Sequence, residues 1–242
     1  MTYIEGFLIP VPAANRDAFE QHARMCAPFF QKHGVTRVVE AWGDDVPDGK
    51  VNDLKKSVNA EPGETVVFSW FEYPDKAARD AANASMRADS EMAEMGGKDM
   101  PFDGARMIMS GFESIVEAGS SQGTGYIDGY VLPVPAANKE SYRAMAAKCA
   151  PIFQEYGALR VVEAWGDDTQ DGRVTDYNRA TLKQPEEEVV YSFVEWPDKA
   201  TRDAAWGKIM GDDRMKPDGE NPFDGKRMMW GGFTPLVDET FG

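Results

Sequence analysis

Apolar and polar residues follow two different spacings along the first part of the chain. Residues Tyr3–Val11 are rich in aromatic and branched side chains in partial alternation, which predicts a β-strand that closes at Pro10 and Pro12. Residues Ala14–His33 carry apolar side chains at helical spacing instead, and Gly34 follows at the place where helices typically end. The apolar stripe of this predicted helix consists of Phe19, Ala23, Cys26, Phe30 and His33.

Three more strands and a second helix are predicted before residue 117. The strands cover Val35–Trp42, Thr65–Tyr73 and Arg106–Val116, and a long polar loop separates the first two. The second of these strands is almost continuously apolar, which indicates that both of its faces are covered. An Ala-rich helix is expected to begin at Pro74-Asp75 and to end near Met92. The resulting order βαββαβ is that of a ferredoxin-like split unit.

The whole pattern occurs twice. Residues Tyr3–Asn15 recur as Tyr126–Asn138 with an offset of 123, and after a two-residue deletion Pro101–Gly104 recurs as Pro222–Gly225. Residues 119–125 between the copies have the composition of a flexible linker. We therefore expect a first ferredoxin-like repeat over residues 1–118, a linker over 119–125 and a second repeat over 126–242.

One such repeat would leave half of its sheet uncovered. A four-stranded βαββαβ sheet carries its helices on one face only, and its other face would expose a larger apolar patch than monomers tolerate. The second copy is the obvious cover. The expected fold is therefore α+β, with two ferredoxin-like repeats packed as an intramolecular dimeric α/β barrel.

Specific motifs occur once in each half. They are the Tyr-Ile-[Glu/Asp]-Gly opening, the Pro-Val-Pro turn, Val-Val-Glu-Ala-Trp-Gly-Asp-Asp, and Pro-Phe-Asp-Gly-[Ala/Lys]-Arg-Met. In these motifs the chain resembles the DUF1428 or YbaA-like family of uncharacterised bacterial proteins, whose members usually carry one copy. The resemblance implies a covalent version of a dimeric α/β barrel, a superfamily that includes cofactor-independent monooxygenases, haem-degrading enzymes and small stress proteins. It implies no established activity.

Charge restricts the expected partners. The 242 residues include 41 Asp and Glu against 26 Lys and Arg, a formal net charge of −15, and the basic residues are scattered singly. A field of this sign repels phosphate backbones and anionic lipids, so neither nucleic acid nor membrane is expected as a partner. The chain also contains no apolar run of about 20 residues, and its N-terminus lacks the pattern of a secretory signal. We expect a cytoplasmic protein, either a monomer or a weak homodimer, with a small molecule as its ligand.

The sequence predicts neither a metal nor another cofactor. The two histidines, His22 and His33, have Met145 and Tyr156 as their repeat partners, which favours packing roles and weakens a vicinal-oxygen-chelate alternative. The loop after Asp44 resembles a calcium loop but has no acid at the twelfth position. No glycine-rich phosphate loop occurs. Cys26 and Cys149 lie on the apolar stripe of the first helix of each repeat and are expected to be small buried side chains.

The candidate site consists of polar residues that lie on strands in both halves. Period two along the second strand places Glu40 on one face with Val38 and Trp42, and Arg37 on the other face. A carboxyl group between these apolar neighbours inside a barrel would have a raised pKa, as a general base requires. The alternative is an ion pair with an arginine of a neighbouring strand. The repeated set is Arg37 and Arg160, Glu40 and Glu163, Trp42 and Trp165, Glu72 and Glu195, and Glu5 and Asp128; the first eight of these residues are the predicted site.

Two functions follow from this set. In the first, the protein is a cofactor-independent enzyme or binder that acts on a small apolar or aromatic metabolite in a pocket between sheet and helices. Glu40 and Glu163 would abstract a proton, and Arg37 and Arg160 would orient the substrate or stabilise an anion. The substrate would contact Trp42, Trp165, Glu72 and Glu195. In the second, the protein is a non-enzymatic structural or stress-related binding module. A filled barrel with fully ion-paired acids would favour the second.

Overall fold

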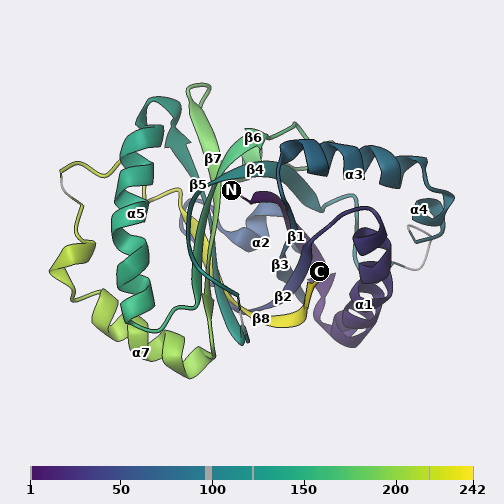
Figure 1. Ribbon diagram of the computed structural model, residues 1–242, viewed down its shortest axis with the longest axis horizontal. Coiled ribbons are helices and arrows are strands. Elements are labelled where there is room, and N and C mark those ends of the chain that lie inside the picture. Colours follow the sequence, from purple (N-terminus) through teal and green to yellow (C-terminus); the bar gives the residue numbers. More distant parts are fainter. Residues whose placement is uncertain (1, 96–99, 122, 218, 242) are drawn as a thin grey trace.

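Eight strands, four from each repeat, close into one barrel (Figure 1). The structure is a computed structural model that describes residues 2–95, 100–121, 123–217 and 219–241. Around the barrel the strands follow the order β1-β3-β2-β8-β5-β7-β6-β4, and β4 returns to β1. Their bounds are β1 (Tyr3–Pro12), β2 (Arg37–Asp45), β3 (Glu64–Tyr73), β4 (Ile108–Gly119), β5 (Tyr126–Pro135), β6 (Arg160–Asp168), β7 (Glu187–Trp196) and β8 (Met229–Thr240).

The last strand of each repeat closes the barrel. β4 pairs with β1 of its own repeat and also with β6 of the second repeat, and β8 pairs with β5 and with β2 in the same way. All of these pairings are antiparallel. The two repeats are therefore joined by main-chain hydrogen bonds at both seams, which leaves no open sheet edge. This arrangement confirms the fold expected from the sequence.

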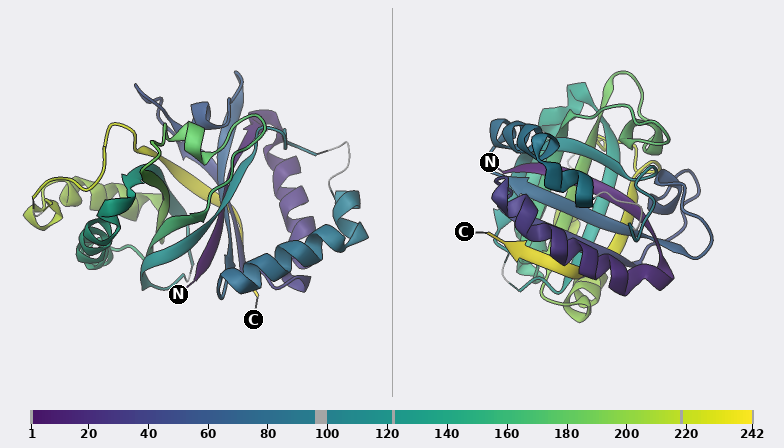
Figure 2. Two further views of the ribbon diagram at one scale, coloured as in Figure 1. Left: turned by 90° about the horizontal axis from the view of Figure 1, so that it is seen from above. Right: turned by 90° about the vertical axis from the view of Figure 1, so that its right-hand side faces the viewer.

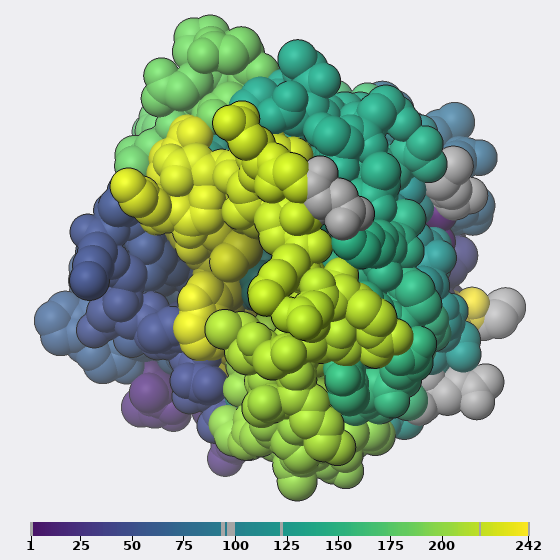
Figure 3. Space-filling view, turned by 90° about the vertical axis from the view of Figure 1, so that its left-hand side faces the viewer, coloured from purple at the N-terminus to yellow at the C-terminus, as the bar shows by residue number. Residues whose placement is uncertain are grey.

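Helices cover the outer face of each half of the barrel. In the first repeat α1 (Arg16–Lys32), α3 (Lys76–Ala88) and α4 (Ser90–Met95) lie on one side of the molecule, and Figure 2 shows α1 and α3 crossing the strands. In the second repeat α5 (Lys139–Glu155) and α7 (Lys199–Ile209) lie on the opposite side, together with the segment that leads to β8 (Figure 3). Among the described residues, no helix is both long enough and apolar enough to cross a membrane.

The helix boundaries differ from the expected ones where aspartates intervene. The second predicted helix is interrupted at Asp89, whose backbone is extended and whose carboxylate accepts a hydrogen bond from the Glu91 amide at 3.0 Å, so that α4 begins anew. The loop expected to be wholly irregular contains α2 (Leu54–Ser57), which has a counterpart in α6 (Tyr177–Ala180). Asp53 caps α2 through the Lys56 amide at 2.7 Å. Short 3-10 turns lie at Ala13–Asn15, Ala136–Asn138 and Asp213–Met215.

Side chains fill the interior of the barrel. Equivalent aromatic residues of the two repeats stack on one another, Trp70 on Phe193 at 4.1 Å and Phe68 on Tyr191 at 4.4 Å between ring centroids. Glycine is required at Gly6 because a Cβ atom there would lie 2.9 Å from the Tyr191 ring. The barrel axis is thus a packed core, so any ligand site has to lie outside it.

The linker forms hydrogen bonds with the barrel on both sides of Gln122. Gln122 lies outside the described residues, as do the expected limits of the repeats at residues 1 and 242. The hydroxyl groups of Ser121 and Thr124 donate hydrogen bonds to Glu195 at 2.8 and 2.6 Å. The segment therefore connects the repeats and also contributes polar contacts to one end of the barrel.

Candidate functional site

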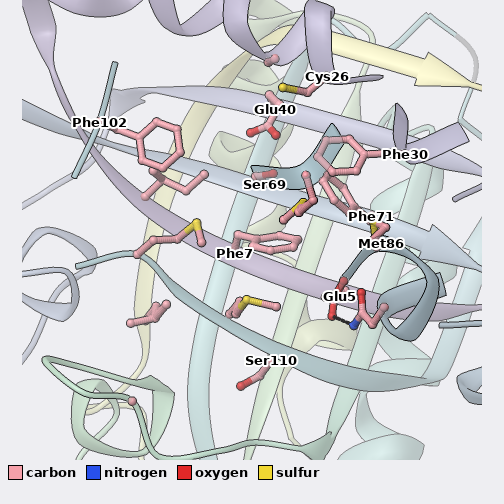
Figure 4. A pocket seen from close by; sticks show the side chains of 18 of the residues that line it. Glu5, Phe7, Cys26, Phe30, Glu40, Ser69, Phe71, Met86, Phe102 and Ser110 are labelled. Carbon is pink, nitrogen blue, oxygen red and sulfur yellow. Dashed lines mark hydrogen bonds between the residues drawn. The ribbon is translucent and has the colours of Figure 1, made fainter. Parts of the chain in front are cut away.

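A cavity of ≈ 730 Å³ lies in the first repeat, between the outer face of the sheet and the helices α1, α3 and α4 (Figure 4). Its floor is aromatic, because Phe71 contacts Phe7 at 4.8 Å and Phe30 at 4.5 Å between ring centroids. Methionines complete much of the wall. The apolar lining includes Phe7, Phe19, Phe30, Phe71, Phe102 and Met86. Such a lining matches that of sites for small, largely apolar molecules.

Glu40 lies at one end of this cavity (Figure 4) and has no charged partner among the residues that the structure describes. Its side chain extends from β2 toward the helices, opposite Ser69 of β3. Burial raises the pKa of Glu40 to about 8, and the Ser69 hydroxyl only partly offsets this rise. Within the described part of the chain, Glu40 Oε2 and Ser69 Oγ have no aligned hydrogen-bond partner. A buried carboxyl with an unused oxygen is costly for a structure, and it is available to a ligand.

Cys26 of α1 lies beside this carboxyl group, and His22 of the same helix lies beside Cys26. Cys26 points toward Glu40 (Figure 4), and burial together with the nearby Glu40 charge raises the pKa of its thiol to about 11. Cys26 Sγ lies 3.7 Å from His22 Nε2. Burial lowers the pKa of His22, so its imidazole is neutral at pH 7. The end of the cavity at Glu40 therefore combines a carboxyl, a hydroxyl, a thiol and a neutral imidazole.

Cys26 is expected to react slowly with a thiol reagent such as dithionitrobenzoate. With a pKa of about 11, only about 0.1% of the thiol is ionised at pH 8, and the side chain is buried. We expect labelling of Cys26 in the native protein to be at least about 100-fold slower than in urea, with peptide mapping to separate it from Cys149. Labelling at the same rate in both states would instead make Cys26 a reactive group of the site.

Glu5 occupies a different part of the cavity and is fully bonded. It accepts hydrogen bonds from Asn83 Nδ2 at 2.7 Å and from the Tyr73 hydroxyl at 3.2 Å, and Arg79 lies 3.5 Å away. Arg79 also contacts Asp168 of the second repeat at 2.7 Å. The loop that follows Asp168 forms part of the cavity wall, so both repeats build this one site.

Larger side chains stand at two corresponding positions of the second repeat. Tyr142 stands where the first repeat has Phe19, and its hydroxyl donates a hydrogen bond to Glu163 Oε2 at 2.6 Å. Trp206 stands where the first repeat has Asn83, and its indole donates to Asp128 at 2.9 Å. Burial raises the pKa of Glu163 to about 6, while the Tyr142 and Ser192 hydroxyls hold it down. The two repeats therefore share a fold but differ at this site.

The predicted partnership between Glu40 and Arg37 is wrong in its geometry. Arg37 points into the barrel, whereas Glu40 faces the helices, because alternate residues of a strand lie on opposite faces. Arg37 contacts Glu195 at 2.8 Å and Glu72 at 3.2 Å, and Arg160 contacts Glu72 at 2.6 Å and Glu195 at 3.3 Å. These four buried residues form a set of ion pairs between the repeats, which we call the interior network. At its edge the partly exposed Asp238 and Glu117 pair with Arg37 at 2.8 Å and with Arg160 at 2.6 Å. The expected ion pairing thus involves Glu72 and Glu195 rather than Glu40 and Glu163.

The remaining predicted contacts also lie away from the cavity lining. Trp42 packs near Phe19 at 6.4 Å between ring centroids, in the core under α1. Trp165 is buried in the second repeat, with the Lys139 ammonium 5.3 Å from its ring. Of the eight predicted site residues, Glu40 alone lines this cavity.

Several cavity residues were missed because they differ between the repeats. His22, Asn83 and Phe19 have Met145, Trp206 and Tyr142 as their counterparts. Polar residues that are present in both halves belong mostly to the symmetric interior network and not to the cavity. The cavity residues are marked instead by a difference between the repeats. At these positions one repeat has a small or apolar side chain where the other has a larger ring or a ring with a hydroxyl group.

The fold and the cavity define a single-chain dimeric α/β barrel with an open apolar site in its first repeat. The chain belongs to the DUF1428 family, described as "Protein of unknown function (DUF1428)", whose profile matches residues 2–104 and again 125–225. The "Uncharacterized protein YbaA" of Escherichia coli strain K12 is 56% identical over 115 residues, which is 47% of this chain and 98% of that protein. The protein of the same name from Shigella flexneri matches equally well.

Solved structures share the fold across the whole chain. A "putative monooxygenase" from Fusobacterium nucleatum superposes with a TM-score of 0.62 at 10% identity, covering 100% of this chain and 95% of the other. A protein of the same description from Lactobacillus acidophilus gives 0.58 at 11% identity, covering 100% and 97%. An "anthrone oxidase-like protein" gives 0.54 at 11% identity, covering 100% and 94%. These identities support the fold and not a shared activity.

Proposed function

We propose that the protein binds a small, predominantly apolar or aromatic molecule in the first-repeat cavity and that Glu40 exchanges a proton with it. The observation that carries this proposal is the unpaired Glu40 oxygen at the end of a cavity lined by phenylalanine and methionine. A soluble metabolite with an apolar body would cover the aromatic floor and supply the missing hydrogen bond.

The raised pKa suits Glu40 to proton transfer near neutral pH. A carboxylate whose conjugate acid has a pKa of about 8 is a far stronger base than an ordinary glutamate, and its proton is not lost outright at pH 7. Glu40 can therefore accept a proton from an activated C–H or O–H group of the bound molecule and return it to another atom. The arginines of the interior network lie on the other face of the sheet and take no part in this proposal.

A non-enzymatic role is the second candidate. Glu72 and Glu195 are ion-paired and the barrel interior is packed, as expected for a structural module. In the second repeat, Tyr142 satisfies Glu163 internally. We propose that this repeat acts as the scaffold for the site of the first.

Substitution of cavity residues of the first repeat by their counterparts in the second repeat is expected to abolish ligand binding. The double variant Glu5→Asp/Asn83→Trp introduces the Asp128–Trp206 pair, whose 2.9 Å hydrogen bond shows that the fold accommodates it. Native mass spectrometry of freshly purified protein should show a retained small molecule in the wild type and not in the double variant, because the indole takes the ligand's space.

Glu163→Gln is the matched control and should leave retention unchanged, because Glu163 lies in the other repeat. Equal retention by the wild type and the double variant would place the ligand elsewhere. A wild-type protein that retains no molecule, and that also binds neither 1-naphthol nor 1-methoxynaphthalene when these are added, would contradict the proposed function.

A further inference from the structure

The second repeat shows how this fold satisfies the equivalent glutamate when no ligand is needed. The Tyr142 ring packs edge-on against Phe223 at 5.9 Å between ring centroids, and its hydroxyl bonds to Glu163. In the first repeat the Phe19 ring packs in the same way against Phe102, at 5.7 Å. The two rings therefore occupy equivalent places, and the first repeat lacks only the hydroxyl group.

This difference accounts for the unused oxygen of Glu40. Phe19 cannot donate a hydrogen bond, so Glu40 Oε2 has no partner within the described chain. From these contacts we propose that the natural ligand carries a hydroxyl group on an aromatic ring, and that this hydroxyl bonds to Glu40 as Tyr142 bonds to Glu163. The inference rests on the proposed function, because it names the class of molecule that enters the cavity: a neutral phenol.

The charges around the cavity support a neutral ligand. Arg79 and Arg87 both line the cavity. Arg79 is already engaged by Glu5 and Asp168, and Arg87 donates a hydrogen bond to the Asn83 carbonyl at 3.0 Å. The other residues around Glu40 add no positive charge at pH 7, since His22 is neutral and the thiol of Cys26 is protonated. Among the residues that the structure describes beside Glu40, a carboxylate or phosphate ligand would find no cation, whereas a phenol is uncharged at pH 7.

A phenol should also change the protonation of Glu40 when it binds. The Tyr142 hydroxyl helps to hold the pKa of Glu163 at about 6, against about 8 for Glu40. Tyr191, on the far side of the sheet, has a pKa well above 10, so neither it nor Cys26 titrates near pH 7. If a bound phenol shifts Glu40 to the pKa of Glu163, roughly 0.8 proton is released per ligand at pH 7.

Titration with 1-naphthol and 1-methoxynaphthalene tests the inference on the full chain. In 1-methoxynaphthalene a methyl group replaces the hydroxyl proton of 1-naphthol, so the ether cannot donate a hydrogen bond, and we expect 1-naphthol to bind at least about tenfold more tightly. Calorimetry in two buffers of different ionisation enthalpy should show proton release with 1-naphthol and none with the ether. Phe19→Tyr should remove the preference, because the new hydroxyl takes the place of the ligand's, and Glu163→Gln should preserve it.

Each outcome decides between the two proposals. Equal affinities without proton release would overturn the phenol inference and leave the proposed cavity binding intact. Failure of both probes to bind would overturn both. If Phe19→Tyr did not fold, the affinity ratio and the proton release of the wild-type protein would still settle the inference.

Discussion

Glu40→Gln is expected to remove a large pH dependence from the stability of the protein. The pKa of Glu40 is about 8 in the folded state and 4.5 in the unfolded chain, so the unfolded state releases its proton first as pH rises. The free energy of unfolding therefore falls as pH rises from the lower of these two pKa values to the higher. The slope of about 1.4 kcal/mol per pH unit gives a loss of about 3–4 kcal/mol between pH 5 and pH 8 from this group alone.

Urea denaturation at pH 5, 6.5 and 8 measures this effect as the difference between variant and wild type. As pH rises from 5 to 8, the free energy of unfolding of Glu40→Gln should increase by about 3–4 kcal/mol relative to that of the wild type. Glu163→Gln is the matched control, and because the pKa of Glu163 is about 6, its corresponding change should be only about 1 kcal/mol. Parallel pH profiles for wild type and Glu40→Gln would show that Glu40 ionises normally, and would remove the basis for its role as a base.

The fold could be predicted because its determinants are local and repeated. The alternation in Tyr3–Val11 and the helical stripe of Ala14–His33 specify elements, and the duplication supplies the partner for each open sheet face. The pairing of β4 with β6 and of β8 with β2 could not be predicted in detail, because it depends on where each long last strand crosses to the other repeat. The interruption at Asp89 depends on a single capping contact.

The site could be predicted only in part, for a physical reason. Period two correctly separated Glu40 from Arg37, and burial next to apolar neighbours correctly implied a raised pKa for Glu40. The expectation that Glu40 faces the barrel interior was wrong, since a strand pattern shows which residues share a face and not which face is inside. The cavity depends on a difference in side-chain volume, because the first repeat has Asn83 where the second has the larger Trp206. Both residues lie on helices, and only the packing of these helices on the sheet determines how far they are from Glu40.

Glu195→Gln is expected to act in the opposite direction from Glu40→Gln and to destabilise the protein by about 3–5 kcal/mol at pH 7. The Glu195 side chain is inaccessible to solvent and accepts hydrogen bonds from Arg37 at 2.8 and 2.9 Å. Removal of its charge takes away the solvent-inaccessible carboxylate that accepts two hydrogen bonds from Arg37, and leaves Glu72 with the partly exposed Asp238 and Glu117 to compensate the two arginines. Burial opposes ionisation of Glu195, yet Arg37 and Arg160 outweigh it and lower its pKa. Its contribution is therefore present above pH 4.5 and is lost only as pH falls through the lowered pKa.

The comparison of Glu195 with Glu40 separates a structural acid from the acid that we propose to exchange a proton with the ligand. Urea denaturation at pH 7 should show a large loss for Glu195→Gln, and a change below about 1 kcal/mol for the surface control Glu20→Gln, whose partner Arg24 is half exposed. Because Glu195 belongs to the second repeat and Arg37 to the first, the loss should include weaker association of the repeats. A neutral or stabilising effect of Glu195→Gln would mean that the interior network does not hold the barrel together, and that its arginines are available for another role.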